Sequence, residues 1–346
     1  MKKSRNIIFK SSILISVFVF SAMFKLYGQD IHFSQYYASP LNLNPAKTGF
    51  LNASNRLVIN NKNQWGSITV PYTTISASFD MQLFKRKFRG DMFGLGVVFN
   101  SDKAGDSEFS TTQGNLSLSY IKSLNNRNNH FISFGIQAGV AQRTINYSEL
   151  VFDKQYNGDS FDPNLSTGEH FTNNNFLFYD ISAGVHWYYK LSHSTSFNGG
   201  FSAFHLNKPK QSLFDNENVK LNQKFIIYGD CQFEVSNKTD LVPGVIITKQ
   251  GPYTEILFGS LIKFERNTNP EQYSAINFGI YSRLVDAAVV IVGIERKKLS
   301  FGISYDVNYS KLQPASNCRG GLELSLTYIF SKSKSNKIKA VPCPIF

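Results

Sequence analysis

The feature that most constrains the fold of this chain is the alternation of apolar and polar residues through about its last two hundred positions. In residues 320–331, leucines and aromatics occupy every second position from Leu322 to Phe330, with polar residues such as Glu323 between them. Because successive side chains of a β-strand point to opposite faces, such a segment has one apolar and one polar face. Repeated segments of this kind, separated by turn residues, are typical of a transmembrane β-barrel.

The alternation and the turn signals between its segments predict fourteen strands. They cover residues 55–62, 73–82, 92–100, 112–122, 129–143, 176–189, 195–206, 224–236, 239–249, 252–263, 273–283, 286–296, 299–307 and 320–331. A charge facing lipid at mid-depth costs roughly 2–4 kcal/mol, so we expect Asp180 and Asp306 to face the lumen. The predicted fold is all-β: an outer-membrane barrel of about 14 antiparallel strands over residues 55–331, with a non-barrel segment before it.

Residues 1–28 have the pattern of a secretory signal peptide. A positive start that includes Lys2 and Arg5 precedes an apolar run from Ile13 to Phe24, and Gly28 offers a small residue for cleavage. The run is shorter than the ~20 residues of a spanning helix, and no other stretch is a candidate for one. We therefore expect export and insertion into the outer membrane through strands.

The lengths of the predicted connections indicate an orientation. The long ones follow odd-numbered strands and cover residues 144–175, 207–223, 101–111 and 308–319, whereas those after even-numbered strands are shorter. Outer-membrane barrels have long external loops and short periplasmic turns, so we expect both termini in the periplasm. Residues 332–346 then form a periplasmic tail. Cys318 would lie near the outer surface and Cys343 in the periplasm, so we expect no disulfide between them.

Residues 29–54 do not have a strand pattern. Pro40 and Pro45 each fix φ and lack a main-chain donor, Asn44 can form local hydrogen bonds, and Gly49 permits a left-handed turn. We expect a structured segment, plug-like, that occupies or frames the periplasmic mouth of the barrel.

The same segment resembles the PorP/SprF family of type IX secretion system outer-membrane proteins. The resemblance rests on Phe33-Ser34-Gln35-Tyr36, on Pro40-Leu41 with Leu43-Asn44-Pro45-Ala46, and on Gly49. It extends over essentially the whole mature chain through Trp65-Gly66, Pro71-Tyr72-Thr73-Thr74, Asp102-Lys103-Ala104-Gly105, Tyr179-Asp180-Ile181-Ser182-Ala183-Gly184, Phe204-His205-Leu206-Asn207-Lys208-Pro209 and the final Cys343-Pro344-Ile345-Phe346. One departure is Ile345, where the family usually has arginine.

The resemblance implies a part in exporting or anchoring surface proteins, including the adhesins of gliding motility. The strand pattern itself implies the lipid bilayer as a partner, and the resemblance adds two more: the type IX secretion machinery and cargo with a C-terminal sorting domain. The motif residues Phe33, Ser34, Gln35, Tyr36, Pro40, Asn44, Pro45 and Gly49 are the candidates for a plug or partner-binding segment. Asn207, Lys208 and Pro209 are the candidates for a functional outer loop.

The sequence offers no pattern for catalysis, a cofactor or a metal. The six histidines are scattered without HExxH or paired-cysteine spacing, and the net charge of +12 is not gathered into an aromatic-interleaved patch for nucleic acid. We therefore expect a protein that is not an enzyme. The alternatives are an outer-membrane channel or transporter for hydrophobic compounds, a porin, and a soluble β-sandwich adhesin.

Overall fold

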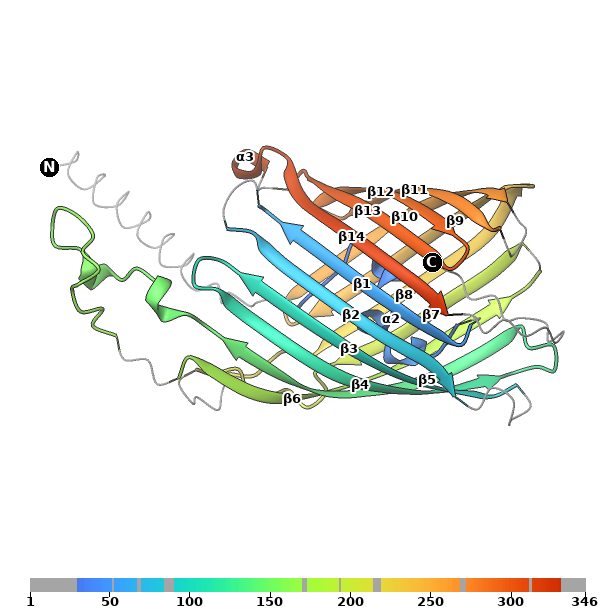
Figure 1. Ribbon diagram of the computed structural model, residues 1–346, viewed down its shortest axis with the longest axis horizontal. Helices are drawn as coiled ribbons and strands as arrows, with labels where there is room; N and C mark the ends of the chain where they lie inside the picture. The colour runs from blue at the N-terminus through green and yellow to red at the C-terminus, as the bar shows by residue number, and fades with distance from the viewer. Residues whose placement is uncertain are drawn as a thin grey trace, which may run out of the picture. The chain divides into compact units, whose positions relative to one another are not determined.

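Fourteen antiparallel strands close into a barrel in the computed structural model of this chain (Figure 1). The structure describes residues 30–330 except 52, 67–69, 84–89, 170–172, 193, 214–218, 268–271 and 311–312. The strands are β1 (Asn55–Gln64), β2 (Tyr72–Leu83), β3 (Met92–Ala104), β4 (Phe109–Ser123), β5 (His130–Thr144), β6 (Asn175–Lys190), β7 (Thr195–Phe204), β8 (Lys224–Ser236), β9 (Thr239–Gln250), β10 (Tyr253–Asn267), β11 (Ser274–Arg283), β12 (Ala287–Arg296), β13 (Leu299–Asn308) and β14 (Arg319–Phe330). The first strand pairs with the last, Asn55 opposite Phe330, so the sheet has no free edge.

The predicted faces of the strands are confirmed. In β6 the outward Tyr179 is 74% exposed, whereas its neighbour Asp180 is buried in the lumen. In β14 the outward Leu322 is exposed and the inward Glu323 is buried. Asp306 of β13 also faces inward. The exposed ring of apolar side chains is therefore the surface that meets lipid.

The two open ends of the barrel differ in their connections. One end, here the terminal mouth, is where β1 begins and β14 ends; the other, the long-loop mouth, carries residues 145–174 and 205–223. The connection expected over residues 101–111 is instead a tight turn at residues 105–108, because β3 and β4 stay paired as far as Ala104 and Phe109. Strand pairing therefore continues beyond the apolar part of these two strands.

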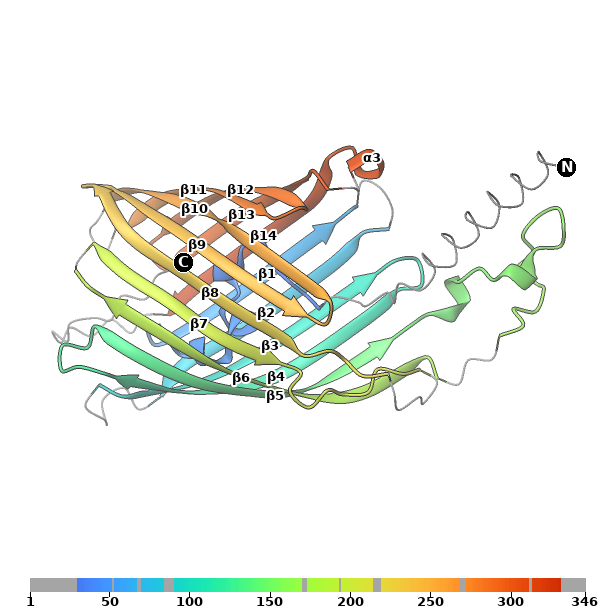
Figure 2. The same cartoon turned by 180° about the vertical axis from the view of Figure 1, so that it is seen from behind.

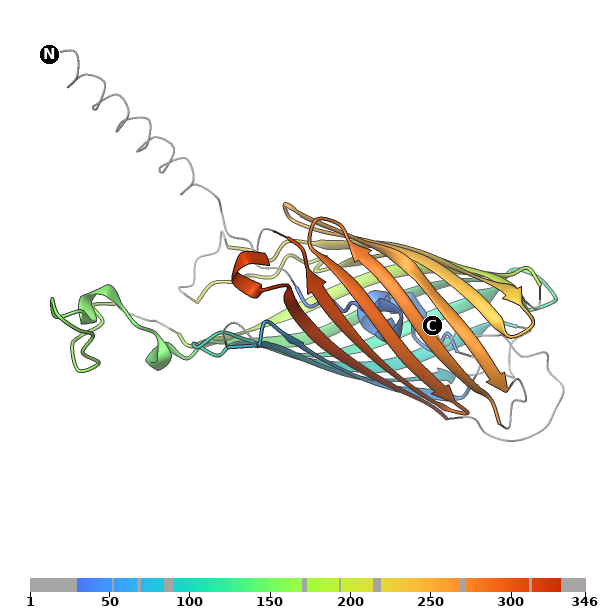
Figure 3. The same ribbon diagram turned by 90° about the horizontal axis from the view of Figure 1, so that it is seen from above.

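Short helices lie inside the barrel (Figures 2 and 3). They are η1 (Tyr36–Ala38), α2 (Pro40–Leu43) and η2 (Pro45–Lys47), and they belong to residues 31–51, which we call the inner segment. The 3₁₀ turns η3 (Tyr147–Glu149) and η4 (Asp153–Gln155) and the helix α3 (Gln313–Ser316) lie in connections at the long-loop mouth. No helix in the described part of the chain has the length and apolar character needed to cross a membrane.

The inner segment runs through the lumen from one mouth to the other. At the long-loop mouth, Lys224 at the start of β8 donates to the Ile31 carbonyl oxygen at 2.8 Å. At the terminal mouth, Gln82 near the end of β2 donates to the Leu51 carbonyl oxygen at 2.5 Å. The segment expected to occupy or frame the periplasmic mouth therefore reaches both mouths of the barrel. Ile31 lies at the opposite end of the barrel from Phe330, because the segment must traverse the lumen before β1 begins.

Candidate functional site

The fold of the inner segment follows from its turn-forming residues. Pro40 opens α2 and Pro45 opens η2, positions where a missing N–H costs no helical hydrogen bond. Asn44 caps η2, since its Oδ1 accepts the Ala46 N–H at 2.8 Å. Gly49 has φ +64°, which takes the chain out of the turn toward β1. These residues make a compact peptide whose remaining polar groups need partners from the barrel wall.

Near the long-loop mouth, the wall binds the segment through buried charges. The Glu323 carboxylate accepts the main-chain N–H of Ser34 at 2.7 Å and that of Gln35 at 2.9 Å. The Ser34 hydroxyl donates to Asp306 at 2.9 Å, and Arg283 donates to the same hydroxyl oxygen at 2.7 Å. Arg283 also pairs with Asp306 at 3.0 Å. This network holds the motif residues by main-chain atoms as well as by side chains.

Two lysines complete the same end of the site. Lys62 donates to the His32 carbonyl oxygen at 3.2 Å, and Lys224 donates to that of Ile31. The Glu255 carboxylate lies 3.6 Å from the His32 ring, so the His32 side chain also belongs to this cluster of polar groups.

In the middle of the lumen, serines of the wall bind carbonyl oxygens of the segment. Three hydroxyls donate in this way: Ser202 to Leu43 at 2.7 Å, Ser133 to Ala46 at 2.7 Å and Ser119 to Thr48 at 2.5 Å. In the other direction, a side chain of the segment binds the wall: Asn44 Nδ2 donates to the Val185 carbonyl oxygen at 2.9 Å. A buried main-chain polar group without such a partner is costly. The polar inner face of β4–β7 therefore complements the segment's own backbone.

The barrel wall has glycines at positions where the main chain of the inner segment comes closest to it. A Cβ at Gly135 on β5 would overlap the main chain of Pro45 and Ala46, and one at Gly94 on β3 would overlap the Thr48 carbonyl. At both positions the obstacle is backbone, which cannot turn aside as a flexible side chain can. The barrel is thus shaped around the segment in the position that the structure shows.

The opposite wall offers an apolar surface. Tyr36 and Leu43 pack in a buried cluster with side chains of β7–β12: Phe204, Ile226, Tyr228, Val242, Ile246, Leu257, Leu261, Tyr281, Val289 and Ile291. The rings of Tyr36 and Tyr281 meet edge to face, 6.2 Å between centroids. The inner segment is therefore bound by apolar packing against β7–β12 and by polar contacts with β4–β7.

At the terminal mouth, a second ion pair holds the end of the segment. Asp80 accepts the Gly49 N–H at 2.7 Å and binds Arg56 through two oxygens, at 2.8 and 2.9 Å. Arg56 also donates to the Lys47 carbonyl oxygen at 3.2 Å. Phe50 packs nearby in its own cluster, with its ring 5.5 Å from that of Tyr188.

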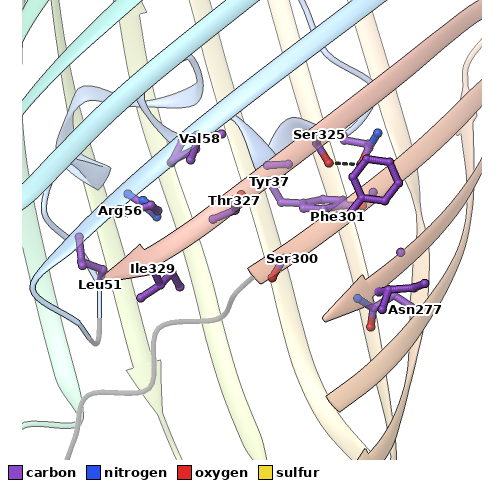
Figure 4. Close-up of a pocket in the computed structure, with 16 residues that line it drawn as sticks. Tyr37, Leu51, Arg56, Val58, Asn277, Ser300, Phe301, Ser325, Thr327 and Ile329 are labelled. Carbon is purple, nitrogen blue, oxygen red and sulfur yellow. Dashed lines mark hydrogen bonds between the residues drawn. The ribbon is translucent and has the colours of Figure 1, made fainter. Parts of the chain in front are cut away.

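A small cavity remains beside the segment, against β1 and β11–β14 (Figure 4). Its lining includes Tyr37, Arg56, Val58 and Asn277, and at its edge Ser325 donates to the Gln35 amide oxygen at 2.7 Å. The cavity volume is about 50 Å³, enough for roughly three or four water molecules. Within the described residues, no three His, Cys, Asp or Glu side chains gather as a metal site.

The other predicted residues lie elsewhere. Asn207 donates to the Tyr179 carbonyl oxygen at 2.6 Å, and the Lys208 and Pro209 main chains bond to His205 and Leu221. None of the contacts described for these three residues reaches the inner segment. The structure thus places the candidates of the inner segment in one site in the lumen, whereas the contacts of Asn207, Lys208 and Pro209 lie outside that site.

Sequence reasoning missed the wall residues that bind the segment. Arg56, Lys62, Arg283 and Lys224 were not singled out, although they are charged residues within predicted strands. The sequence could have identified them, because each occupies an inward position in the alternation of its strand. A charge at an inward position needs a partner in the lumen, and the inner segment provides it.

Together the closed sheet, the lipid-facing surface and the peptide held in the lumen define an outer-membrane β-barrel with an internal plug-like segment. The chain belongs to the type IX secretion system membrane protein PorP/SprF family, whose sequence model matches residues 25–328. It is therefore a membrane component of type IX secretion. Among curated proteins, none matches the chain.

Solved outer-membrane barrels share the fold at low identity. The Ralstonia pickettii toluene transporter TbuX is 9% identical, with a TM-score of 0.50 over 84% of this chain and 94% of that one. The Pseudomonas putida toluene transporter TodX is 11% identical, with a TM-score of 0.47 over 88% and 98%. The CymD monoaromatic hydrocarbon channel is 11% identical, with a TM-score of 0.46 over 85% and 93%. At such identities the likeness concerns the fold alone.

Proposed function

We propose that this protein is a non-conducting, non-enzymatic barrel that supports the export or surface anchoring of type IX cargo, such as gliding adhesins with a C-terminal sorting domain. The observation that carries the proposal is the inner segment, which the wall binds from one mouth to the other. A barrel built in this way serves as a platform in the membrane rather than as the path of the cargo.

The energetics of the segment support a fixed position. Hydrogen bonds to charged groups contribute about 1.5–3 kcal/mol each, and Glu323, Asp80, Lys62 and Lys224 all make them to its main chain. Withdrawal of the segment would leave these charges in the lumen and expose the apolar wall around Tyr281. Opening is therefore costly unless a partner replaces the same contacts.

The proposal also includes the orientation of the barrel in the outer membrane. The long-loop mouth faces outward, as the lengths of residues 145–174 and 205–223 favour. Asn207, Lys208 and Pro209 then lie on the outer side with the segment's Ile31 end. The signal peptide (residues 1–28) and the periplasmic tail (residues 332–346) lie outside the described residues and stay predictions, as does the absence of a disulfide to Cys343.

The test is a gene deletion with complementation. Surface proteins of intact cells would be compared by protease shaving and mass spectrometry, with uptake of a large antibiotic as the measure of permeability. We expect selected sorting-domain proteins to leave the surface while permeability stays unchanged. Full display in the deletion strain would reject the proposal.

The alternatives of a channel for hydrophobic compounds and a porin make a different prediction. Both require a continuous path through the lumen, whereas the inner segment contacts the wall at both mouths, through Lys224 and Gln82. Purified full-length protein in planar bilayers distinguishes them. A steady current favours a porin, and a hydrocarbon uptake defect in the deletion strain favours a transporter.

A further inference from the structure

The loop between β5 and β6 is a structured arm. Residues 146–169, which we call the arm, extend beyond the strand ends at the long-loop mouth (Figures 1 and 3). Gln155 organises it: its main-chain oxygen accepts the Asp162 N–H at 2.8 Å, and its buried side chain bonds to Phe152 and Leu165. Connections of this length are uncommon in compact domains and are usually functional or disordered. The internal hydrogen bonds of the arm point to function.

Large apolar side chains project from this arm into water. Val151 is 68% exposed and Tyr156 is 57% exposed, and Phe161 and Leu165 are also exposed. Outward strand residues with similar exposure meet lipid, but the arm lies beyond the strands. Large apolar side chains exposed on an ordered, projecting element are typical of a protein–protein contact.

The negative charge of the arm indicates which kind of partner it can bind. It carries five carboxylates (Glu149, Asp153, Asp159, Asp162 and Glu169) and one cation, Lys154, in a chain whose net charge is +12. Anionic lipid headgroups would repel it. A partner with a basic surface would be attracted, and complementary charge speeds the encounter of two proteins.

We propose that the arm is the docking site for a protein whose surface combines basic side chains with an apolar pocket. The apolar side chains Val151 and Tyr156 enter the pocket and the carboxylates at Asp159 and Asp162 meet the basic rim. This rests on the proposed function, since the expected partner is exported cargo.

The first experiment places a photo-crosslinking amino acid at Tyr156 in the full-length protein in living cells. We expect a crosslink to an exported protein. The Asp159→Lys/Asp162→Lys variant should lower its yield about tenfold, as expected for the reversal of close interface charges, whereas Asp159→Glu/Asp162→Glu should keep it. A crosslink to lipid alone, no crosslink, or a yield unaffected by charge reversal would overturn the proposal.

The second experiment measures surface display in the deletion strain complemented with variants. Val151→Ser/Tyr156→Ser should reduce display of the crosslinked protein. Leu284→Ser/Val285→Ser is the matched control, because Val285 is 82% exposed in a tight turn at the same mouth. If the deletion lowers display but the arm variant does not, the arm proposal fails and the function stands. If the deletion leaves display unchanged but the charge-dependent crosslink persists, the proposed function fails and the docking site stands.

Discussion

The Glu323 carboxylate accepts the main-chain N–H of Ser34 at 2.7 Å, although 289 positions separate the two residues. Glu323 belongs to β14, which closes the barrel against β1, and Ser34 belongs to the segment that precedes β1. The contact therefore links closure of the sheet to docking of the inner segment. A segment that entered after closure would have to pass through the finished lumen, so we infer that the wall assembles around it.

Glu323→Gln tests this link. The amide keeps the size of the side chain but replaces a charged acceptor of two N–H groups, so we expect the barrel to lose roughly 2–4 kcal/mol of stability. The readout is the temperature at which the purified barrel loses its heat-modifiable migration on gels. Glu234→Gln, at an exposed position on β8, should match the wild type. Equal unfolding temperatures for all three proteins would contradict the prediction.

Gly135→Ala tests whether the wall is shaped around the segment. The added Cβ would overlap the main chain of Pro45 and Ala46, so we expect the segment to shift and become sensitive to protease in purified barrels. Bilayer conductance should rise as the lumen opens. The control is Gly114→Ala on the adjacent β4, where a Cβ meets nothing within 4 Å. If the Gly135→Ala barrel stays resistant to protease and shows no conductance, the segment accommodates the added Cβ without leaving its position.

The direction of the inner segment is testable by labelling in intact cells. In a protein whose native cysteines are replaced by serine, Ile31→Cys should react with a membrane-impermeant maleimide from outside. The reason is that Ile31 lies at the long-loop mouth, held by Lys224. Lys238→Cys, in the β8–β9 turn at the terminal mouth, should react only after permeabilisation. The reverse pattern would show that the proposed orientation is inverted.

The sequence predicts the barrel well because each strand carries its own local signal. Asp180, Asp306 and Glu323 could be assigned to the lumen from the alternation of their strands, and all three are buried there. The path of the inner segment could not be predicted, since Pro40 and Asn44 specify turns without specifying their surroundings. Partners such as Arg283 lie some 250 positions away from Ser34, and only the closed barrel brings them together.

The final prediction concerns Asp80, which holds the other end of the inner segment. Asp80→Asn removes the charge that faces buried Arg56 at 2.8 Å, and breaking a buried pair from one side costs about 3–5 kcal/mol. Arg56→Met should cost a similar amount, whereas the double variant should be more stable than the sum of the two losses implies, because it leaves neither charge behind. Urea unfolding of the barrel in lipid vesicles measures all four proteins. Asp91→Asn, at a half-buried site next to Tyr120, serves as the control. Strictly additive losses would mean that Arg56 and Asp80 bind the segment independently rather than as one unit.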